Sequence, residues 1–152
     1  SPDAGAVKRT LKFARIIGLK TLIMHKERNY SNPGTVSKTI LVCDGVEDFS
    51  NKIGIITDDM IDSGGTFIKA CETLIKKGFK QIIGVITHGL FTGDALHNIE
   101  KSTFVTKVIV TNSISQEENI KKCSKLEVID ISTQLTEAIT RIHEGGSLSM
   151  LF

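Results

Sequence analysis

The stretch that decides the fold is Ile53–Thr66, IGIITDDMIDSGGT. It opens on an apolar run that is short enough for a strand buried on both faces. Acidic residues follow the run, and two glycines then lead into a segment with helical apolar spacing that ends at Gly78. The stretch therefore predicts a strand, an acidic turn, a glycine-rich loop and a helix. In an open α/β sheet such a loop lies at the carboxyl edge, where ligands bind.

The glycine-rich loop has the residue types of a phosphate-binding turn. Gly64 and Gly65 let backbone N–H groups approach an anion, and the start of the following helix adds partial positive charge. Ser63 and Thr66 add hydroxyl donors. The loop lacks the lysine of a Walker A loop, and the chain has no GxGxxG. The loop suits a phosphate monoester, although a polar turn in which Ser63 or Thr66 caps a helix would explain the same residues.

The three acidic residues of the stretch need a partner other than the phosphate. Asp58, Asp59 and Asp62 are carboxylates, and like charges repel in a desolvated site. We expect them to bind hydroxyl groups or a divalent cation. Phosphate at one end of a ligand and hydroxyls at the other describe a sugar phosphate.

Composition and charge exclude several classes of protein. A chain of 152 residues is long enough for one domain with a real core, and its net charge of +2 is ordinary for a globular protein. The charges are mixed along the chain, which gives no polybasic surface for nucleic acid, and no apolar run is long enough to span a membrane. The three cysteines form no CxxC pair, so we expect reduced thiols, a cytoplasmic protein and no zinc site.

Outside the central stretch, apolar runs alternate with helical patterns. We expect helices at 6–18, 94–101, 116–123 and 132–144, strands at 21–24, 39–43, 81–87, 107–111 and 127–131, and an edge strand or a frayed end at 147–152. Residues 29–38 include Asn32, Pro33 and Gly34 and predict a loop. The alternation predicts an α/β fold of three layers, with a mainly parallel sheet and helices on both faces.

The motif ITDDMIDSGGT closely resembles the ribose-phosphate-binding loop of the type I phosphoribosyltransferase fold, in the form found in ribose-phosphate diphosphokinases (PRPP synthetases). The resemblance extends over the chain: SPDAGAVKR at 1–9, THG at 87–89, VIVTN at 108–112 and CSKLEVIDIS at 123–132. It implies that residues 1–152 form a single phosphoribosyltransferase-like domain, the carboxy-terminal half of a longer two-domain enzyme. In that family the amino-terminal domain supplies much of the ATP site.

The resemblance also assigns catalytic and metal-binding roles. Lys26 would be the main catalytic residue, and Arg28 would contact substrate phosphate and help stabilise the transition state. Both lie in HKER at the end of a predicted strand, where spacing alone would also fit a solvated charge cluster. Asp3, otherwise a helix cap, would belong to a Mg²⁺ site. Ala6 stands where the family usually has a second glycine.

For the substrate, the resemblance assigns Asp58 and Asp59 to the ribose hydroxyls and their associated metal. Asp62, Ser63, Gly64, Gly65 and Thr66 would wrap the 5-phosphate. The chain ends in a sequence resembling the family's GxSxSxLF, where Ser147, Ser149 and Phe152 would help form an allosteric site for phosphate and ADP between subunits.

The implied reaction transfers the diphosphoryl group of ATP to the C1 hydroxyl of ribose 5-phosphate, giving PRPP and AMP. The parent would use Mg²⁺ and form a homo-oligomer, a hexamer of dimers in the family, without nucleic acid or membrane partners. We expect these 152 residues alone to fold but to be essentially inactive. Two alternatives remain: a phosphoribosyltransferase that uses PRPP and a nucleobase, and a non-catalytic subunit that regulates an active synthetase. Intact Lys26 and Arg28 and the short stretch 29–38 favour a catalytic parent.

Overall fold

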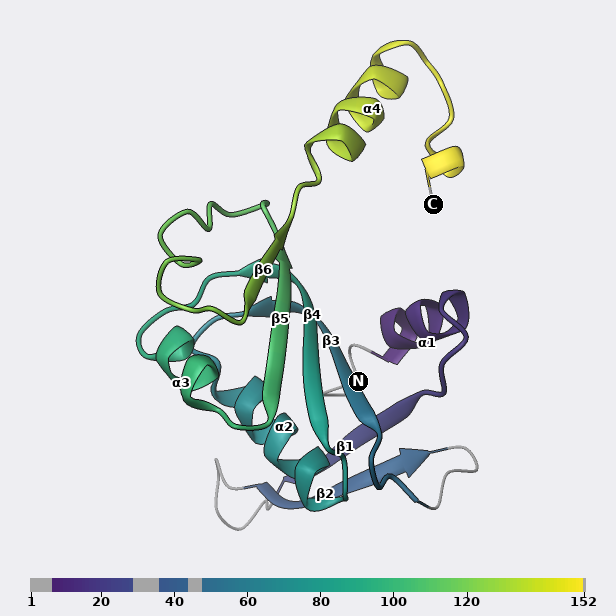
Figure 1. The fold of residues 1–152 in the computed structure, drawn as a ribbon. Coiled ribbons are helices and arrows are strands. Elements are labelled where there is room, and N and C mark those ends of the chain that lie inside the picture. The colour runs from purple at the N-terminus through teal and green to yellow at the C-terminus, as the bar shows by residue number, and fades with distance from the viewer. Residues whose placement is uncertain (1–6, 29–35, 44–47, 152) are drawn as a thin grey trace.

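The computed structural model describes residues 7–28, 36–43 and 48–151, without the side chains of 25–28, 36–41 and 43 (Figure 1). The helices are α1 (Val7–Ile16), α2 (Gly65–Lys76), α3 (Ala95–Lys101), α4 (Ser132–His143) and the short 3-10 helix η1 (Leu148–Leu151). The strands are β1 (Leu22–Arg28), β2 (Val36–Cys43), β3 (Ile53–Ile61), β4 (Gln81–Gly89), β5 (Val105–Thr111) and β6 (Leu126–Ile129).

Four strands form a parallel sheet in the order β3-β4-β5-β6. The connections from β3 to β4 and from β4 to β5 pass through α2 and α3, because parallel neighbours need a long crossover. In Figure 1, α2 and α3 lie on one face of the sheet and α1 lies on the other. The predicted three-layer α/β fold with a mainly parallel sheet is therefore confirmed.

The core fills the space between the sheet and α2, and in it side chains pack closely against the backbone at two glycines. Ile56, Ile82 and Val108 are almost completely buried. A Cβ on Gly54 would lie 2.8 Å from the Ile82 Cδ1, and a Cβ on Gly84 would lie 3.0 Å from the Phe67 ring. The apolar runs of β3 and β4 thus supply buried side chains, and their glycines leave the space that neighbouring side chains fill.

The strands before the central motif do not join the parallel sheet. β1 and β2 pair antiparallel as a separate two-stranded sheet, with Leu22 opposite Cys43. Both strands are longer than the sequence predicted, so the predicted loop at 29–38 was wrong for the part that falls in β2. A short connection between two strands suits antiparallel pairing. The prediction of alternating strands and helices did not include such a hairpin.

The predicted helix at 116–123 is absent, and turns take its place. These turns are closed by hydrogen bonds from the Asn119 and Ile120 N–H groups to the Gln116 carbonyl. Gln116 itself is buried and its side-chain amide donates to the Gly89 carbonyl at 2.7 Å. The segment buries only Gln116 and Cys123, at its two ends, and a short polar helix without a continuous apolar stripe is marginal.

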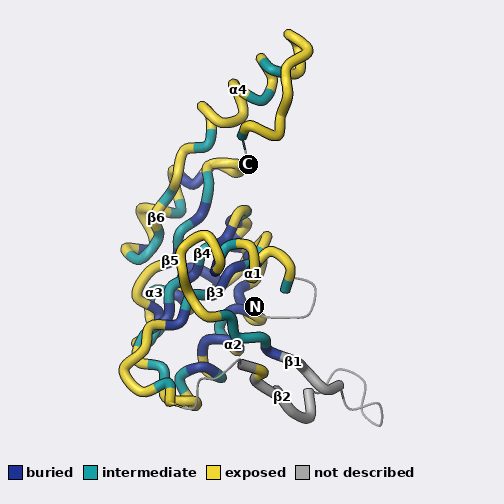
Figure 2. The backbone as a smooth tube through the Cα atoms, turned by 90° about the vertical axis from the view of Figure 1, so that its right-hand side faces the viewer, coloured by how far each residue is buried: buried dark blue, intermediate teal, exposed yellow. Residues whose placement is uncertain are grey.

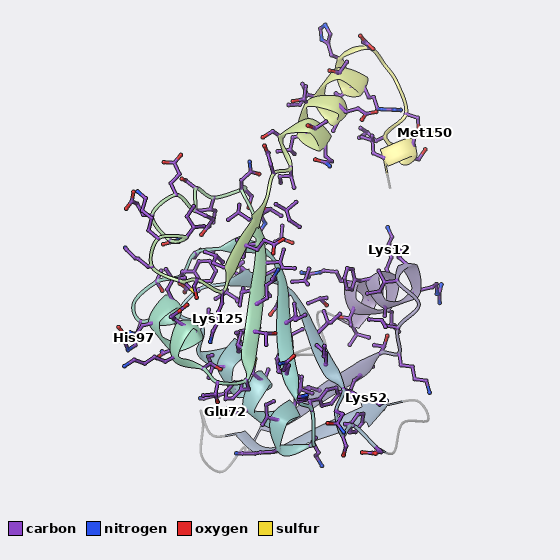
Figure 3. The ribbon with its side chains drawn as sticks, viewed as in Figure 1. Lys12, Lys52, Glu72, His97, Lys125 and Met150 are labelled. Carbon is purple, nitrogen blue, oxygen red and sulfur yellow. The ribbon has the colours of Figure 1, made fainter. Side chains whose placement is uncertain are left out.

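Lys125 ties the start of β6 to the end of α3 (Figure 3). Its ammonium group donates hydrogen bonds of 2.5–3.1 Å to the carbonyl oxygens of Ile99, Glu100 and Ser102. Carbonyls at the end of a helix have no partner within the helix and carry partial negative charge. A cation there both donates hydrogen bonds to them and offsets that charge.

The last helix leaves the body of the molecule. None of the residues of α4 is buried, and Figure 2 shows the helix extending away from the sheet. It ends at His143, and Gly145 adopts a left-handed φ of 71°, as expected for the glycine pair that follows. The tail then forms η1 rather than the predicted edge strand or frayed end. Among the described residues, no helix has the length and apolar character needed to cross a membrane.

Candidate functional site

The glycine-rich loop joins β3 to α2 and leaves the first turn of the helix open. Gly64 is the N-cap residue, with φ +78°, and the first intrahelical hydrogen bond runs from the Ile68 N–H to the Gly64 carbonyl at 2.9 Å. The N–H groups of Gly65, Thr66 and Phe67 therefore have no acceptor within the helix. No side chain caps this helix, so the alternative in which Ser63 or Thr66 acts as the cap was wrong.

A hollow of about 270 Å³ lies at this loop and is lined by residues 58–67. Ser63, Gly65 and Thr66 are exposed there, while Gly64 is buried beneath them. The hollow combines open backbone N–H groups, two hydroxyls and the positive end of the α2 dipole. Such a set can hold a dianionic phosphate without a lysine.

The three carboxylates around the hollow point to different partners. Asp58 accepts the Asp59 N–H at 3.0 Å, Asp59 lies 3.5 Å from the Arg9 guanidinium of α1, and Asp62 accepts the Thr92 hydroxyl at 2.6 Å. Desolvation alone would raise the pKa of the Asp59 carboxyl, but Arg9 and local hydrogen bonds outweigh it and lower the pKa. The Asp59 carboxylate is therefore charged at neutral pH.

The residues at this edge of the sheet have the oxygen donors that Mg²⁺ prefers, but the described residues alone do not form a complete set of ligands for it. Carboxylate oxygens are its preferred protein ligands, and Asp58 and Asp59 supply them beside the hollow. Within the described ranges, no three potential ligands gather closely enough to hold a metal ion. Magnesium at this edge would complete its shell with water and substrate oxygens, as it does in many phosphate sites.

Several residues predicted for the site fall wholly or partly outside the described region. Lys26 and Arg28 lie two apart near the carboxyl end of β1, in extended backbone as expected, but their side chains are not described. Asp3 and Phe152 lie outside the described residues altogether. The hydroxyls of Ser147 and Ser149 are 2.7 Å apart in the tail beyond α4, which is remote from the glycine-rich loop in Figure 1.

Sequence reasoning gave no role to two residues that contact the site. Arg9 is one: it contacts Asp59 from α1, one residue before Thr10, whose hydroxyl pairs with that of Thr57 at 2.8 Å, and no spacing in the sequence points to this contact. Thr92 is the other, and it lies between β4 and α3 in LFTGD. Its contact with Asp62 depends on how two loops pack together, which no local pattern encodes.

A model of the phosphoribosyl synthetase-associated domain matches residues 22–152, which include β1, the glycine-rich loop and the tail. The chain belongs to the phosphoribosyl synthetase-associated domain family. This membership places the hollow of residues 58–67 and the HKER segment of β1 in one family domain.

Curated relatives of this family domain match along the whole chain. Ribose-phosphate pyrophosphokinase 3 of Saccharomyces cerevisiae is 45% identical over 152 residues, and ribose-phosphate pyrophosphokinase A of Dictyostelium discoideum is 41% identical over 152 residues. The match covers 45% and 46% of those two proteins, so the chain spans about half their length.

A solved structure agrees with these relatives. The crystal structure of phosphoribosylpyrophosphate synthetase from Mycobacterium smegmatis is similar to this chain with a TM-score of 0.78 and 32% identity. The match covers 95% of this chain and 44% of that one. The similarity therefore extends through the parallel sheet and the segments that surround the glycine-rich loop.

Proposed function

We propose that the chain is the ribose 5-phosphate-binding, catalytic half of a ribose-phosphate diphosphokinase. The parent enzyme transfers the diphosphoryl group of ATP to the C1 hydroxyl of ribose 5-phosphate, which gives PRPP and AMP. In this proposal residues 1–152 are the carboxy-terminal half of a two-domain protein, whose other half completes the ATP site. Relatives named ribose-phosphate pyrophosphokinase, matched over the whole chain, support it.

One observation carries the proposal: the first turn of α2 presents N–H groups that lack acceptors within the helix, next to exposed hydroxyls and flanking carboxylates. The 5-phosphate would accept hydrogen bonds from Ser63, Gly64, Gly65 and Thr66. The ribose hydroxyls would donate to Asp58 and Asp59, whose negative charge suits donors and repels phosphate. This polarity fixes which end of the sugar phosphate enters the loop.

Lys26 and Arg28 would act on the transferred group rather than on the ribose. Diphosphoryl transfer spreads negative charge over phosphate oxygens in the transition state, and positioned cations stabilise that charge. The two residues lie two apart near the carboxyl end of β1, where the pairing with β2 shifts register between Glu27 and Arg28. Arg28 would also hold substrate phosphate.

The proposal includes the partners implied by the family. Mg²⁺ would be held partly by Asp58, Asp59 and Asp3 and would offset phosphate charge when bound. ATP would be the co-substrate. Ser147, Ser149 and Phe152 would contribute to an effector site for phosphate and ADP in a cytoplasmic homo-oligomer.

A non-catalytic, associated subunit is the second candidate, because the matching family model is described as a synthetase-associated domain. Such a subunit would bind and regulate an active synthetase without turning over ATP. The two candidates differ in what they require of Lys26, because only an enzyme needs a cation there during transfer.

The test compares Lys26→Ala with Glu27→Ala, its neighbour in β1, in the full-length protein. An assay of AMP release from ATP and ribose 5-phosphate should show a loss of about 100-fold or more in kcat for Lys26→Ala and little change for Glu27→Ala. Equal rates in the two variants would reject the catalytic assignment. Activity with PRPP and a nucleobase, without ATP, would instead indicate a phosphoribosyltransferase.

A further inference from the structure

We propose that Thr92, which lies between β4 and α3, is a positioning residue: it engages the Asp62 carboxylate, which lines the hollow, and so keeps that carboxylate from covering the N–H groups of the phosphate-binding loop. The proposal rests on the proposed function of that loop and adds a residue to which neither the sequence nor the family resemblance assigns a role. Thr92 would not touch the substrate. It would act through Asp62, whose carboxylate accepts the Thr92 hydroxyl at 2.6 Å.

The segment that carries Thr92 is fastened along the end of β3. The Ile61 carbonyl accepts the N–H groups of Leu90 at 2.8 Å and Phe91 at 3.3 Å. The next carbonyl, that of Asp62, accepts the Thr92 N–H at 3.1 Å. The segment between β4 and α3 therefore lies alongside the residues that lead into the glycine-rich loop. Backbone hydrogen bonds as well as the side-chain contact hold Thr92 next to Asp62.

Backbone strain marks the same segment. Phe91 has φ +51°, a left-handed conformation that is exceptional for a bulky side chain. Its ring is buried and packs so closely on Gly89 that a Cβ there would lie 2.3 Å from the ring. A strained residue persists only where its surroundings hold it, and such residues concentrate near functional sites. Here the strain turns the chain so that the next residue meets Asp62.

The direction of the Asp62 carboxylate matters because of its place in the loop. Asp62 lies two residues before the N-cap Gly64, beside N–H groups that have no acceptor within α2. A carboxylate next to a helix N-terminus is itself a good acceptor for such groups. The resemblance places Asp62 among the residues that wrap the 5-phosphate. Without the Thr92 hydroxyl, its carboxylate could instead occupy these N–H groups as an internal anion and would then repel the phosphate. The Thr92 hydroxyl gives one of its oxygens a different, charge-assisted hydrogen bond.

The test uses Thr92→Val, which keeps the shape of the side chain but removes the hydroxyl, and Thr92→Ser, which keeps the hydroxyl. Thr92 is exposed, so neither change should disturb the core. In calorimetric titration of the chain with ribose 5-phosphate and Mg²⁺, Thr92→Val should raise Kd about tenfold, equivalent to about 1.4 kcal/mol. Thr92→Ser should remain within about twofold of the unaltered chain.

A double variant distinguishes positioning from general support of the fold. If the unheld Asp62 carboxylate is the cause, Thr92→Val combined with Asp62→Ala should bind ribose 5-phosphate more tightly than Thr92→Val alone. A purely structural role for Thr92 would make the double variant as weak as the single variant or weaker. Either of those results, or equal Kd values for Thr92→Val and Thr92→Ser, would overturn the proposal.

A measurement without ligand separates this proposal from the proposed function. In the ¹H–¹⁵N NMR spectrum of the ligand-free chain, Thr92→Val should shift amide resonances of residues 63–67, because Asp62 then comes within reach of those N–H groups, while Thr92→Ser should leave them in place. Unchanged resonances in Thr92→Val would overturn the proposal for Thr92. If those resonances shift as expected but the unaltered chain binds no ribose 5-phosphate, the proposal for Thr92 stands and the proposed function fails.

Discussion

Alanine substitution at Gly64 and at Gly65 should have opposite effects on stability, although the two residues are adjacent. Gly64 has φ +78°, whereas Gly65 begins α2 and has no atom near the position of an added Cβ. A left-handed conformation costs an L-residue about 1–2 kcal/mol. At Gly64 the added Cβ would lie 3.4 Å from the Ala95 Cβ, which is ordinary contact and adds little.

Both substitutions also restrict the unfolded chain, which favours folding by about 0.4–1 kcal/mol. Because this effect is common to both variants, their difference isolates the backbone conformation at Gly64. We expect Gly64→Ala to lower the free energy of unfolding by about 0.5–1 kcal/mol and Gly65→Ala to raise it by about 0.4–1 kcal/mol. In a domain of this size, 1 kcal/mol corresponds to about 2–4 °C in Tm.

Urea unfolding followed by circular dichroism measures both free energies, and thermal unfolding checks their order. The same preparations can be titrated with ribose 5-phosphate. Gly65→Ala should bind it less well despite its greater stability, because the new methyl group projects beside the open N–H groups. Equal stability of the two variants would refute the left-handed N-cap on which the open first turn of α2 depends.

Three further predictions concern thiols, acid stability and the contact between α3 and β6. Burial raises the pKa of the Cys71 thiol to about 12 and also raises the pKa of Cys123, the other buried thiol. In a Cys43→Ser background the native chain should therefore react with a thiol reagent at pH 8 far more slowly than the urea-unfolded chain, and equal rates would contradict the buried positions of both thiols. Hydrogen bonds from the Ser132 hydroxyl and N–H lower the pKa of Asp130 from its ordinary 3.8, so its stabilising effect is complete above that value and is lost as the pH falls through the lowered pKa. Asp130→Asn should therefore flatten the pH dependence of the free energy of unfolding below about pH 5, and an unchanged slope there would argue against the Ser132 contacts. Lys125→Met should cost about 1–3 kcal/mol because the carbonyls at the end of α3 lose a charged donor, whereas the exposed Lys122→Met should change stability by less than about 0.5 kcal/mol; equal losses would exclude the Lys125 contacts.

The sequence was most informative where local patterns and tertiary structure agree. The run from Ile53 combines an apolar strand, a glycine turn and a helix, and each part is specified by its own residues. The parallel sheet follows from that unit, because a strand and a crossover helix place the next strand parallel to the first. Gly78, with φ +101°, ends α2 as expected.

The predictions of secondary structure were wrong where packing against neighbouring segments decides the structure. Residues 116–123 are polar enough for a surface helix, yet the burial of Gln116 and Cys123 holds the segment in turns. The β1–β2 hairpin depends on pairing between strands, which apolar runs alone do not specify.

The contacts of the candidate site were also beyond local patterns. The residue types of the loop were predicted, but not that each carboxylate has a different partner. The contacts of Asp59 with Arg9 and of Asp62 with Thr92 join positions 50 and 30 residues apart, and the left-handed conformation of Phe91 goes against its own preference. Such features arise from packing and become visible only in three dimensions.

A crystal structure of the chain with ribose 5-phosphate and Mg²⁺ would test the proposed sugar-phosphate site most directly. We expect the phosphoryl oxygens to lie within hydrogen-bonding distance of the N–H groups of residues 63–66 and the ribose hydroxyls to face Asp58 and Asp59. A sugar phosphate bound in the reverse orientation, or with its phosphoryl group away from α2, would contradict this proposal.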